Sequence, residues 1–229
     1  MNFLRSMALC VSLAAAVGGL QAATSGRLTQ EETASGINAA ITRGAEFAVD
    51  QLGKKDGFMG NPKVRIGLPE SFRKAEKAAR MFGFSKQTDE LVEAMNRAAE
   101  VAVAQAKPIL VSAIKNMSLR DAKDILFGPQ DAATQYFKRT TSDELANRFR
   151  PIVKNATAKV ELVDKYNAFA GKAVQFGLVD AKEADLDNYV TTKAMDGLFL
   201  MIAEQEKTIR ADPIGTGSAL LKRVFGATR

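Results

Sequence analysis

The side chains that could do chemistry in this chain are chiefly carboxylates. The sequence contains no histidine, and its single cysteine, Cys10, lies in a segment that we expect to be removed. A Ser-His-Asp triad, a thiolate nucleophile and the usual zinc sites each need an imidazole or a sulfur. We therefore exclude these classes of site and expect neither a metal nor a cofactor. Carboxylates, lysines, tyrosines, hydroxyls and backbone groups remain.

Three glutamates could form an acid and base pair: Glu100 together with Glu93 or Glu206. Two carboxylates can serve as general acid and general base when their surroundings separate their pKa values, as in glycoside hydrolysis. One hypothesis is therefore a hydrolase or lyase acting on envelope polysaccharide. Against it, the sequence has three tyrosines and no tryptophan, so aromatic platforms for sugars are few.

The helix expected around residues 95–100 has two faces. Glu93, Arg97 and Glu100 point away from the apolar face, and Asn96 lies on the boundary. We expect a solvated exterior with a Glu93–Arg97 pair at i,i+4, because charged residues are rarely buried without a partner. If Asn96 and Glu100 were buried, they would belong to a polar network. The apolar face consists of Leu91, Met95, Ala98, Ala99, Ala102 and Ala106.

Residues 53–68 form the longest irregular stretch, with four glycines and Asn61-Pro62. Asp56, Asn61 and Arg65 lie on this loop, which could bind a ligand or simply connect two helices. It lacks the Gly-Lys-Ser/Thr order of a phosphate-binding P-loop. Because Asp56 is its only acid, it does not fit a Ca²⁺ loop either.

Two further groups are candidates for binding or for a polar network. Glu206 and Arg210 stand at i,i+4 and are expected to be a helix-stabilising pair. Thr134 and Tyr136 are two residues apart, so they cannot share one helix face. Tyr136 is expected to fill the core.

A basic stripe is predicted on the helix that begins near Pro69. On a helical wheel it lies opposite Phe72, Ala75, Ala79 and Phe82. We expect it to be solvated, and the alternative is a docking surface. The stripe consists of Arg73, Lys74, Lys77 and Arg80.

The elements that must position these residues are predicted to be helices, in an all-α, irregular bundle of about eight to nine helices, some kinked, without a significant sheet. Capping boxes mark helix starts at Thr29, Ser118 and Thr141, and glycines mark ends at Gly53, Gly83 and Gly128. Prolines 108 and 151 are expected to kink or break their helices. The later helices are expected at about 160–176, 184–210 and near residues 220–225.

Residues 1–23 have the order of a secretory signal peptide: Arg5, an uncharged apolar run and small residues at Ala22-Ala23. The run is shorter than a bilayer span, which disfavours a membrane anchor. We expect cleavage, a periplasmic or otherwise exported chain, and a single domain over residues 24–229 without a transmembrane helix. The net charge of +6 falls to about +5 without Arg5, which suits anionic lipid or glycan. In an exported protein we expect no nucleic acid partner.

Short segments in a fixed order run along nearly the whole chain after residue 23. They are Asp56-Gly57-Phe58, Asn61-Pro62, Val64 to Pro69, Met95 to Glu100, Asp121-Ala122, Ile125-Leu126, Gly128, Ala133-Thr134, Tyr136-Phe137, Glu206-Lys207, Ile209-Arg210, Pro213, and Leu220 to Lys222 with Val224 to Gly226. Together these segments resemble the bacterial family known as domain of unknown function 4197. The resemblance implies an exported helical protein whose family has no established activity, so no catalytic residue is transferred.

These observations favour a non-catalytic binding or interaction protein of the cell envelope that could hold a hydrophobic or anionic ligand. Its partner could be a lipid, an anionic envelope component or an envelope protein. The carboxylate hydrolase or lyase is one alternative, and a structural assembly factor is another. The assembly role would use the apolar patch Leu198, Phe199, Met201 and Ile202, for which we expect core burial instead.

Overall fold

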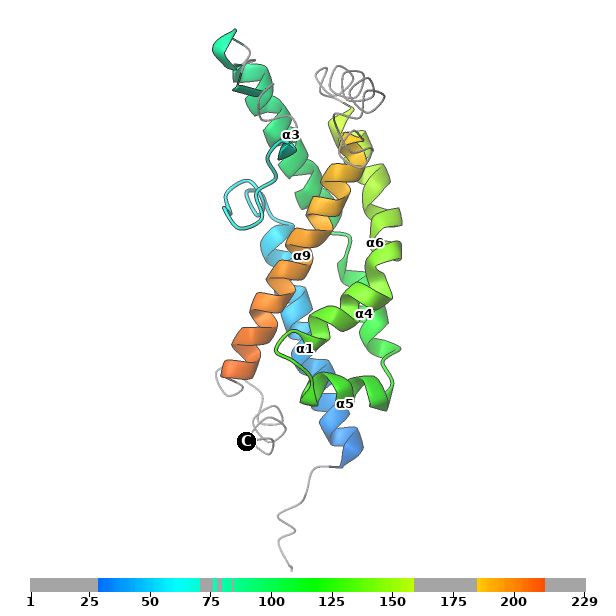
Figure 1. Cartoon of the computed structure of the whole chain (residues 1–229). Helices are drawn as coiled ribbons and strands as arrows, with labels where there is room; N and C mark the ends of the chain where they lie inside the picture. The colour runs from blue at the N-terminus through cyan, green and yellow to red at the C-terminus, as the bar shows by residue number, and fades with distance from the viewer. Residues whose placement is uncertain (1–28, 71–75, 78–79, 84, 159–184, 213–229) are drawn as a thin grey trace, which may run out of the picture.

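The computed structural model describes residues 29–70, 76–77, 80–83, 85–158 and 185–212. Within them lie six complete α-helices and no strand, so the prediction of an all-helical fold is confirmed. Figure 1 shows the arrangement: α1 (Gln30–Leu52), α3 (Ser85–Val103), α4 (Lys107–Lys115), α5 (Leu119–Phe127), α6 (Ala132–Thr157) and α9 (Leu186–Ala211).

Two predicted capping boxes start helices. Thr29 begins α1: its side chain accepts from the Glu32 N–H at 3.1 Å, and the Glu32 carboxylate accepts from the Thr29 N–H at 2.9 Å. Ser118 and Asp121 make the same reciprocal pair at α5. Because these side chains satisfy amides that have no partner within the helix, the starts are fixed locally.

The expected eight to nine helices are not reached in the described residues, and one predicted boundary is wrong. Thr141 does not start a helix but lies inside α6, where its hydroxyl donates to the Phe137 carbonyl at 2.7 Å. Phe137, Thr141, Leu145 and Phe149 lie on one buried face of α6. Continuous packing of that face outweighs a local start signal, and α6 also continues through Pro151.

Pro108 accompanies a break between two helices. The helix α3 ends at Val103 and α4 begins at Lys107, with the proline in its first turn. A proline is tolerated there because its missing N–H would have no partner within the helix in any case.

The helix α9 is the centre of the bundle: it packs against α1, α3 and α6. The helix α6 also contacts α3, α4 and α5. One hydrophobic cluster runs through these interfaces. The apolar patch considered for assembly belongs to this core, as we expected, since Leu198, Phe199, Met201 and Ile202 are all buried.

The loop after α1 is anchored in the core by three apolar side chains. Phe58 is fully buried, and Val64 and Ile66 are nearly so. Its turns need unusual backbone: Asp56 has φ +66°, and a Cβ at Gly57 would meet the Leu52 carbonyl oxygen. Such a tightly folded segment needs polar side chains to satisfy its amides.

Several predictions lie outside the described residues: the signal peptide at 1–23, the helices at 160–176 and near residues 220–225, and most of the helix that begins near Pro69. None of the described helices is long and apolar enough to cross a membrane.

Candidate functional site: a clamped loop and its cleft

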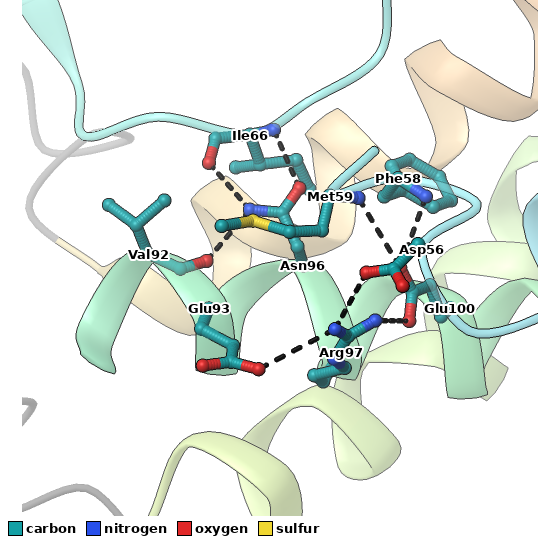
Figure 2. A network of polar contacts seen from close by, with 9 residues as sticks. All are labelled: Asp56, Phe58, Met59, Ile66, Val92, Glu93, Asn96, Arg97 and Glu100. Atoms are coloured by element: carbon teal, nitrogen blue, oxygen red, sulfur yellow. Dashed lines mark hydrogen bonds and ion pairs between the residues drawn. The ribbon is translucent and has the colours of Figure 1, made fainter. Parts of the chain in front are cut away.

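Asn96 on α3 holds one end of the loop, as Figure 2 shows. Its Oδ1 accepts from the Ile66 N–H at 2.9 Å, and its Nδ2 donates to the Ile66 carbonyl at 2.8 Å. A second Nδ2 bond, 2.7 Å long, reaches the Val92 carbonyl one turn back. The Asn96 side chain is fully buried. It therefore pairs with the Ile66 backbone as a neighbouring strand would.

Glu100, one turn further along α3, holds the other end of the loop. Its Oε1 accepts from two consecutive amides, the Phe58 N–H at 3.1 Å and the Met59 N–H at 3.3 Å. Glu100 is 3% exposed, so the expectation of a solvated exterior is wrong here. The burial is tolerated because the carboxylate receives both amides and a guanidinium.

That guanidinium belongs to Arg97, which links three carboxylates at the rim of the loop. It donates to Glu100 Oε2 at 2.8 Å and to Asp56 Oδ1 at 2.8 Å, and it lies 3.5 Å from Glu93 Oε1. The expected Glu93–Arg97 pair is thus present as the longest of the three contacts. The hydrogen bond to Glu100 raises the pKa of Arg97 most, and the bond to Asp56 raises it further. Arg97 remains charged and closes the network.

A second buried glutamate lies at the start of α6. Glu206 of α9 accepts from the Ala133 N–H at 2.9 Å through Oε1, and from the Thr134 N–H at 3.0 Å and hydroxyl at 2.9 Å through Oε2. Asp131, at the N-cap position of α6, makes no side-chain cap bond. Glu206 therefore caps α6 from another helix, where its negative charge suits the helix dipole.

Arg210 joins this carboxylate to the end of α5. Its Nη2 lies 2.8 Å from Glu206 Oε1 and donates to the Ile125 carbonyl at 2.7 Å. The carbonyls in the last turn of a helix lack partners within it, and a cation there is favourable. The predicted i,i+4 pair exists, but it does more than stabilise α9, because it ties the α5–α6 junction to it.

Thr134 and Tyr136 point to different neighbours, as their spacing predicted. Thr134 contacts Glu206, whereas the Tyr136 hydroxyl donates to the Ala113 carbonyl at 2.8 Å. Tyr136 is 5% exposed and belongs to the core cluster. Burial raises the pKa of Tyr136, and the negative charge of Asp121 raises it further by a smaller amount. A phenol held neutral in this way fills space and is not poised as a base.

A cleft of about 690 Å³ lies between the segment 62–70 and α9, with Val92 of α3 also in its wall. The Tyr189 hydroxyl spans it at one point by donating to the Gly67 carbonyl at 3.1 Å. Its charged lining consists of Lys63, Arg65, Arg80, Lys193, Glu70, Glu76 and Asp196. The volume lies in the range of small-molecule sites, and the lining suits a polar ligand.

Arg65 differs from the other cations of the cleft. Lys63 pairs with Glu204 at 2.6 Å, and Lys193 lies 4.0 Å from Asp196. Within the part of the chain that the structure describes, the exposed Arg65 side chain forms no ion pair. Asn61 does not line the cleft: it accepts from the Lys63 N–H at 3.1 Å and thus shapes the turn before Arg65.

Half of the predicted basic surface can be placed. Arg73 and Lys74 lie outside the described residues, and Lys77 is exposed. Arg80 lies 2.8 Å from Asp89 and 3.1 Å from Glu76, and its bonds to Asp89 and then Glu76 raise its pKa. Arg80 is therefore already paired within the chain.

The three glutamates considered for acid and base catalysis are not brought together in the cleft, because Glu93, Glu100 and Glu206 do not line it. Glu206 borders a different, small apolar cavity of about 30 Å³. No group of three or more potential metal ligands occurs among the described residues.

Sequence reasoning missed the part of the cleft that α9 supplies. Tyr189, Lys193 and Asp196 line it. Their spacing of three and four residues on one helix face was the available signal. Nothing local indicated that this face would meet residues more than 120 positions earlier in the chain.

The sequence profile of one protein family, described as "Protein of unknown function (DUF4197)", matches residues 27–226. No curated protein and no solved structure matches the chain.

Proposed function

Since the chain belongs to the DUF4197 family of proteins of unknown function, whose description assigns no activity, we propose a function from the geometry of the cleft. The protein is a non-catalytic binding protein of the cell envelope that holds an anionic ligand between the segment 62–70 and α9. The observation that carries this proposal is the Arg65 guanidinium, which lines a cleft of about 690 Å³ without an ion pair among the described residues.

The wall that carries Arg65 is held in place by buried bonds. Asn96 binds both backbone groups of Ile66, the next residue in the chain. Ile66 is itself 2% exposed. A side chain on a fixed backbone loses less conformational entropy when it binds, so this arrangement favours recognition.

Arg65 is the charge of the cleft that favours an anion. The lining contains four cationic and three acidic side chains, and three of these cations already face acids: Lys63 faces Glu204, Arg80 faces Glu76 and Asp89, and Lys193 faces Asp196. A phosphate or carboxylate group could accept two parallel bonds from the Arg65 guanidinium. The location in the envelope is supported by the signal-like sequence of residues 1–23.

A hydrophobic ligand is less well supported by the described cavities. The apolar cavity beside Glu206 measures about 30 Å³, which leaves no room for a lipid chain. Catalysis by a carboxylate pair also lacks support. Glu206 accepts five hydrogen bonds, two from amides, one from a hydroxyl and two from Arg210, and these occupy the lone pairs that a substrate proton would need.

The proposal is tested on protein exported from a bacterial host and purified without detergent. Its native mass is compared with its denatured mass to detect a ligand carried through purification. Inorganic phosphate is then titrated calorimetrically into the wild type and Arg65→Gln. We expect Arg65→Gln to weaken phosphate binding by about tenfold or more, because a hydrogen-bonded charge partner is lost.

The matched control is Arg120→Gln, which removes the same charge from α5. The Arg120 side chain is 91% exposed and lies 4.0 Å from Asp124. The Arg120→Gln variant should bind phosphate as the wild type does. Equal weakening in both variants would reduce the effect to net charge, and a wild type that carries no adduct and binds no phosphate would contradict the proposal.

A further inference from the structure

Two adjacent apolar side chains, Met81 and Phe82, project into solvent. They are 85% and 80% exposed, the largest values among the large hydrophobic residues in the described parts of the chain. On the helical wheel Phe82 lies opposite the basic stripe. Exposed apolar pairs of this kind mark a contact with something outside the chain more often than isolated exposed residues do.

The pair lies at the apex of an ordered turn just before α3. Gly83 has φ +89° and its N–H donates to the Arg80 carbonyl at 3.3 Å. The Ser85 hydroxyl donates to the same carbonyl at 3.4 Å. In Figure 1 the start of α3 lies at one end of the molecule, with α5 at the other. The turn at residues 80–83 lies close to that start in the chain, so it belongs to the same end of the molecule. We call residues 80–83 the tip.

Three cations and three acids lie at or beside the tip: Lys77, Arg80 and Lys86, and Glu76, Asp89 and Glu90. The first charged residue beyond the apex on either side is basic, Arg80 before it and Lys86 after it. Arg80 is paired, but Lys77 is exposed and the Lys86 side chain is 86% exposed, with Glu90 at 3.8 Å. The acids Asp89 and Glu90 follow about one helical turn after Lys86. Among the described residues Lys77 forms no ion pair, and an apolar apex beside such an exposed lysine complements a surface whose outer layer is anionic and whose interior is apolar.

We propose that the tip docks on a bilayer that contains anionic phospholipid, with Met81 and Phe82 entering the boundary between headgroups and acyl chains. Lys77 and Lys86 then face the lipid phosphates. A protein partner fits less well, because a stable protein interface buries roughly 800 Å² on each partner and the tip offers two apolar side chains. Arg80 belongs both to the tip and to the lining of the ligand cleft, but Met81 and Phe82, which carry this inference, do not line the cleft.

The absence of tryptophan from the sequence gives a direct reporter. Phe82→Trp places one indole at the tip, and Phe127→Trp places one at an equally open position on α5, where the phenylalanine is 72% exposed. Each variant is produced with export in a bacterial host, and the mass of the purified chain identifies its N-terminus. Vesicles of phosphatidylcholine, with and without about a quarter of phosphatidylglycerol, are then added. We expect a blue shift of the indole emission for Phe82→Trp with the anionic vesicles, and none for Phe127→Trp.

Cosedimentation with the same vesicles measures binding without a reporter. The double variant Met81→Ser/Phe82→Ser should partition about tenfold less than the wild type, because two apolar side chains no longer leave water. Phe127→Ser should partition as the wild type does, and raised salt should weaken wild-type binding. The exposed serines should leave the helical circular dichroism signal unchanged.

The proposal would be overturned if the wild type and the double variant bound the vesicles equally. It would also be overturned if the wild type did not bind the anionic vesicles. A wild type that is dimeric in native mass spectra, with a monomeric double variant, would overturn it in favour of contact between two copies. Arg65→Gln keeps the tip, so its vesicle binding separates failure of this inference from failure of the cleft.

Discussion

Two buried glutamates in this molecule use the same chemistry for different ends. Glu100 accepts from the consecutive amides of Phe58 and Met59 and from Arg97, which stands three residues earlier. Glu206 accepts from the consecutive amides of Ala133 and Thr134 and from Arg210, four residues later. Each carboxylate thus joins two backbone N–H groups to a guanidinium on its own helix.

The difference lies in whose amides are bound. Around Glu206 they open α6, and Arg210 reaches the end of α5, so every bond there completes a helix. Around Glu100 they belong to a loop without regular structure whose continuation lines the cleft. The first arrangement stabilises the junction of three helices, and the second also fixes a surface that a ligand could touch. Perturbing the two should therefore separate stability from binding.

The largest effect is expected from Glu206→Ala. It leaves the Arg210 guanidinium without its carboxylate and two amides of α6 without a partner. Loss of one member of such a buried pair destabilises by about 3 kcal/mol or more. Urea unfolding followed by circular dichroism measures the change in the free energy of unfolding. Phosphate binding, measured where the variant is still folded, should stay at the wild-type level.

Glu204→Ala is the control for this variant, because it removes a glutamate two residues away on α9. Glu204 pairs with Lys63, and both side chains are more than a third exposed. Such an exposed pair contributes about 1 kcal/mol or less. If both variants lost the same small amount, the junction would not depend on the interhelical cap.

A smaller loss of stability, together with weaker binding, is expected from Asn96→Leu. The change keeps the size of the side chain but leaves the Ile66 N–H and carbonyl unpaired in a buried place, at a cost of about 2 kcal/mol. Because Arg65 adjoins Ile66, calorimetry should also show weaker phosphate binding. Asn147→Leu on the exposed side of α6 should change neither quantity. We call the bonds from Asn96 to Ile66 and from Glu100 to Phe58 and Met59 the clamp. Unchanged phosphate binding in folded Asn96→Leu would show that the clamp does not shape the cleft.

Local signals were enough to predict much of the fold. Thr29 and Ser118 start helices as expected, because a capping box is complete within four residues. The same signal fails at Thr141, where the apolar face shared by Phe137 and Leu145 continues the helix. A cap pattern can be recognised in a sequence, but whether packing overrides it depends on helices far away in the chain.

The site was predicted in part. Asn96, Glu100 and Glu206 were chosen as candidates from residue type, yet exposure was expected for Glu100. Their true partners, the amides of Phe58, Ile66 and Ala133, are backbone groups 30 to 73 residues distant. Every residue carries such an amide, so composition and spacing give no sign of which one will be bound. The clamp exists only once the loop has folded against α3.

Alanine substitutions at two glycines, Gly197 of α9 and Gly44 of α1, test how rigid the clamp is. Gly197→Ala places a Cβ 2.7 Å from Phe58 Cε1 and 3.3 Å from Val64 Cβ. Phe58 is fully buried, so overpacking should exceed the gain in helix propensity and cost about 1 kcal/mol net. Gly44→Ala meets Ile209 Cδ1 at 3.4 Å, an ordinary contact, and should stabilise by about 1 kcal/mol.

The opposite signs are the informative result, read from the urea midpoints of the two variants. Gly197 lines the cleft, so its alanine variant should also bind phosphate more weakly, whereas Gly44→Ala should not. If both alanines stabilised, the ring of Phe58 would be able to yield. The loop would then not be a fixed wall, although Glu100 binds its amides, and the cleft would owe its shape to the ligand instead of to the clamp.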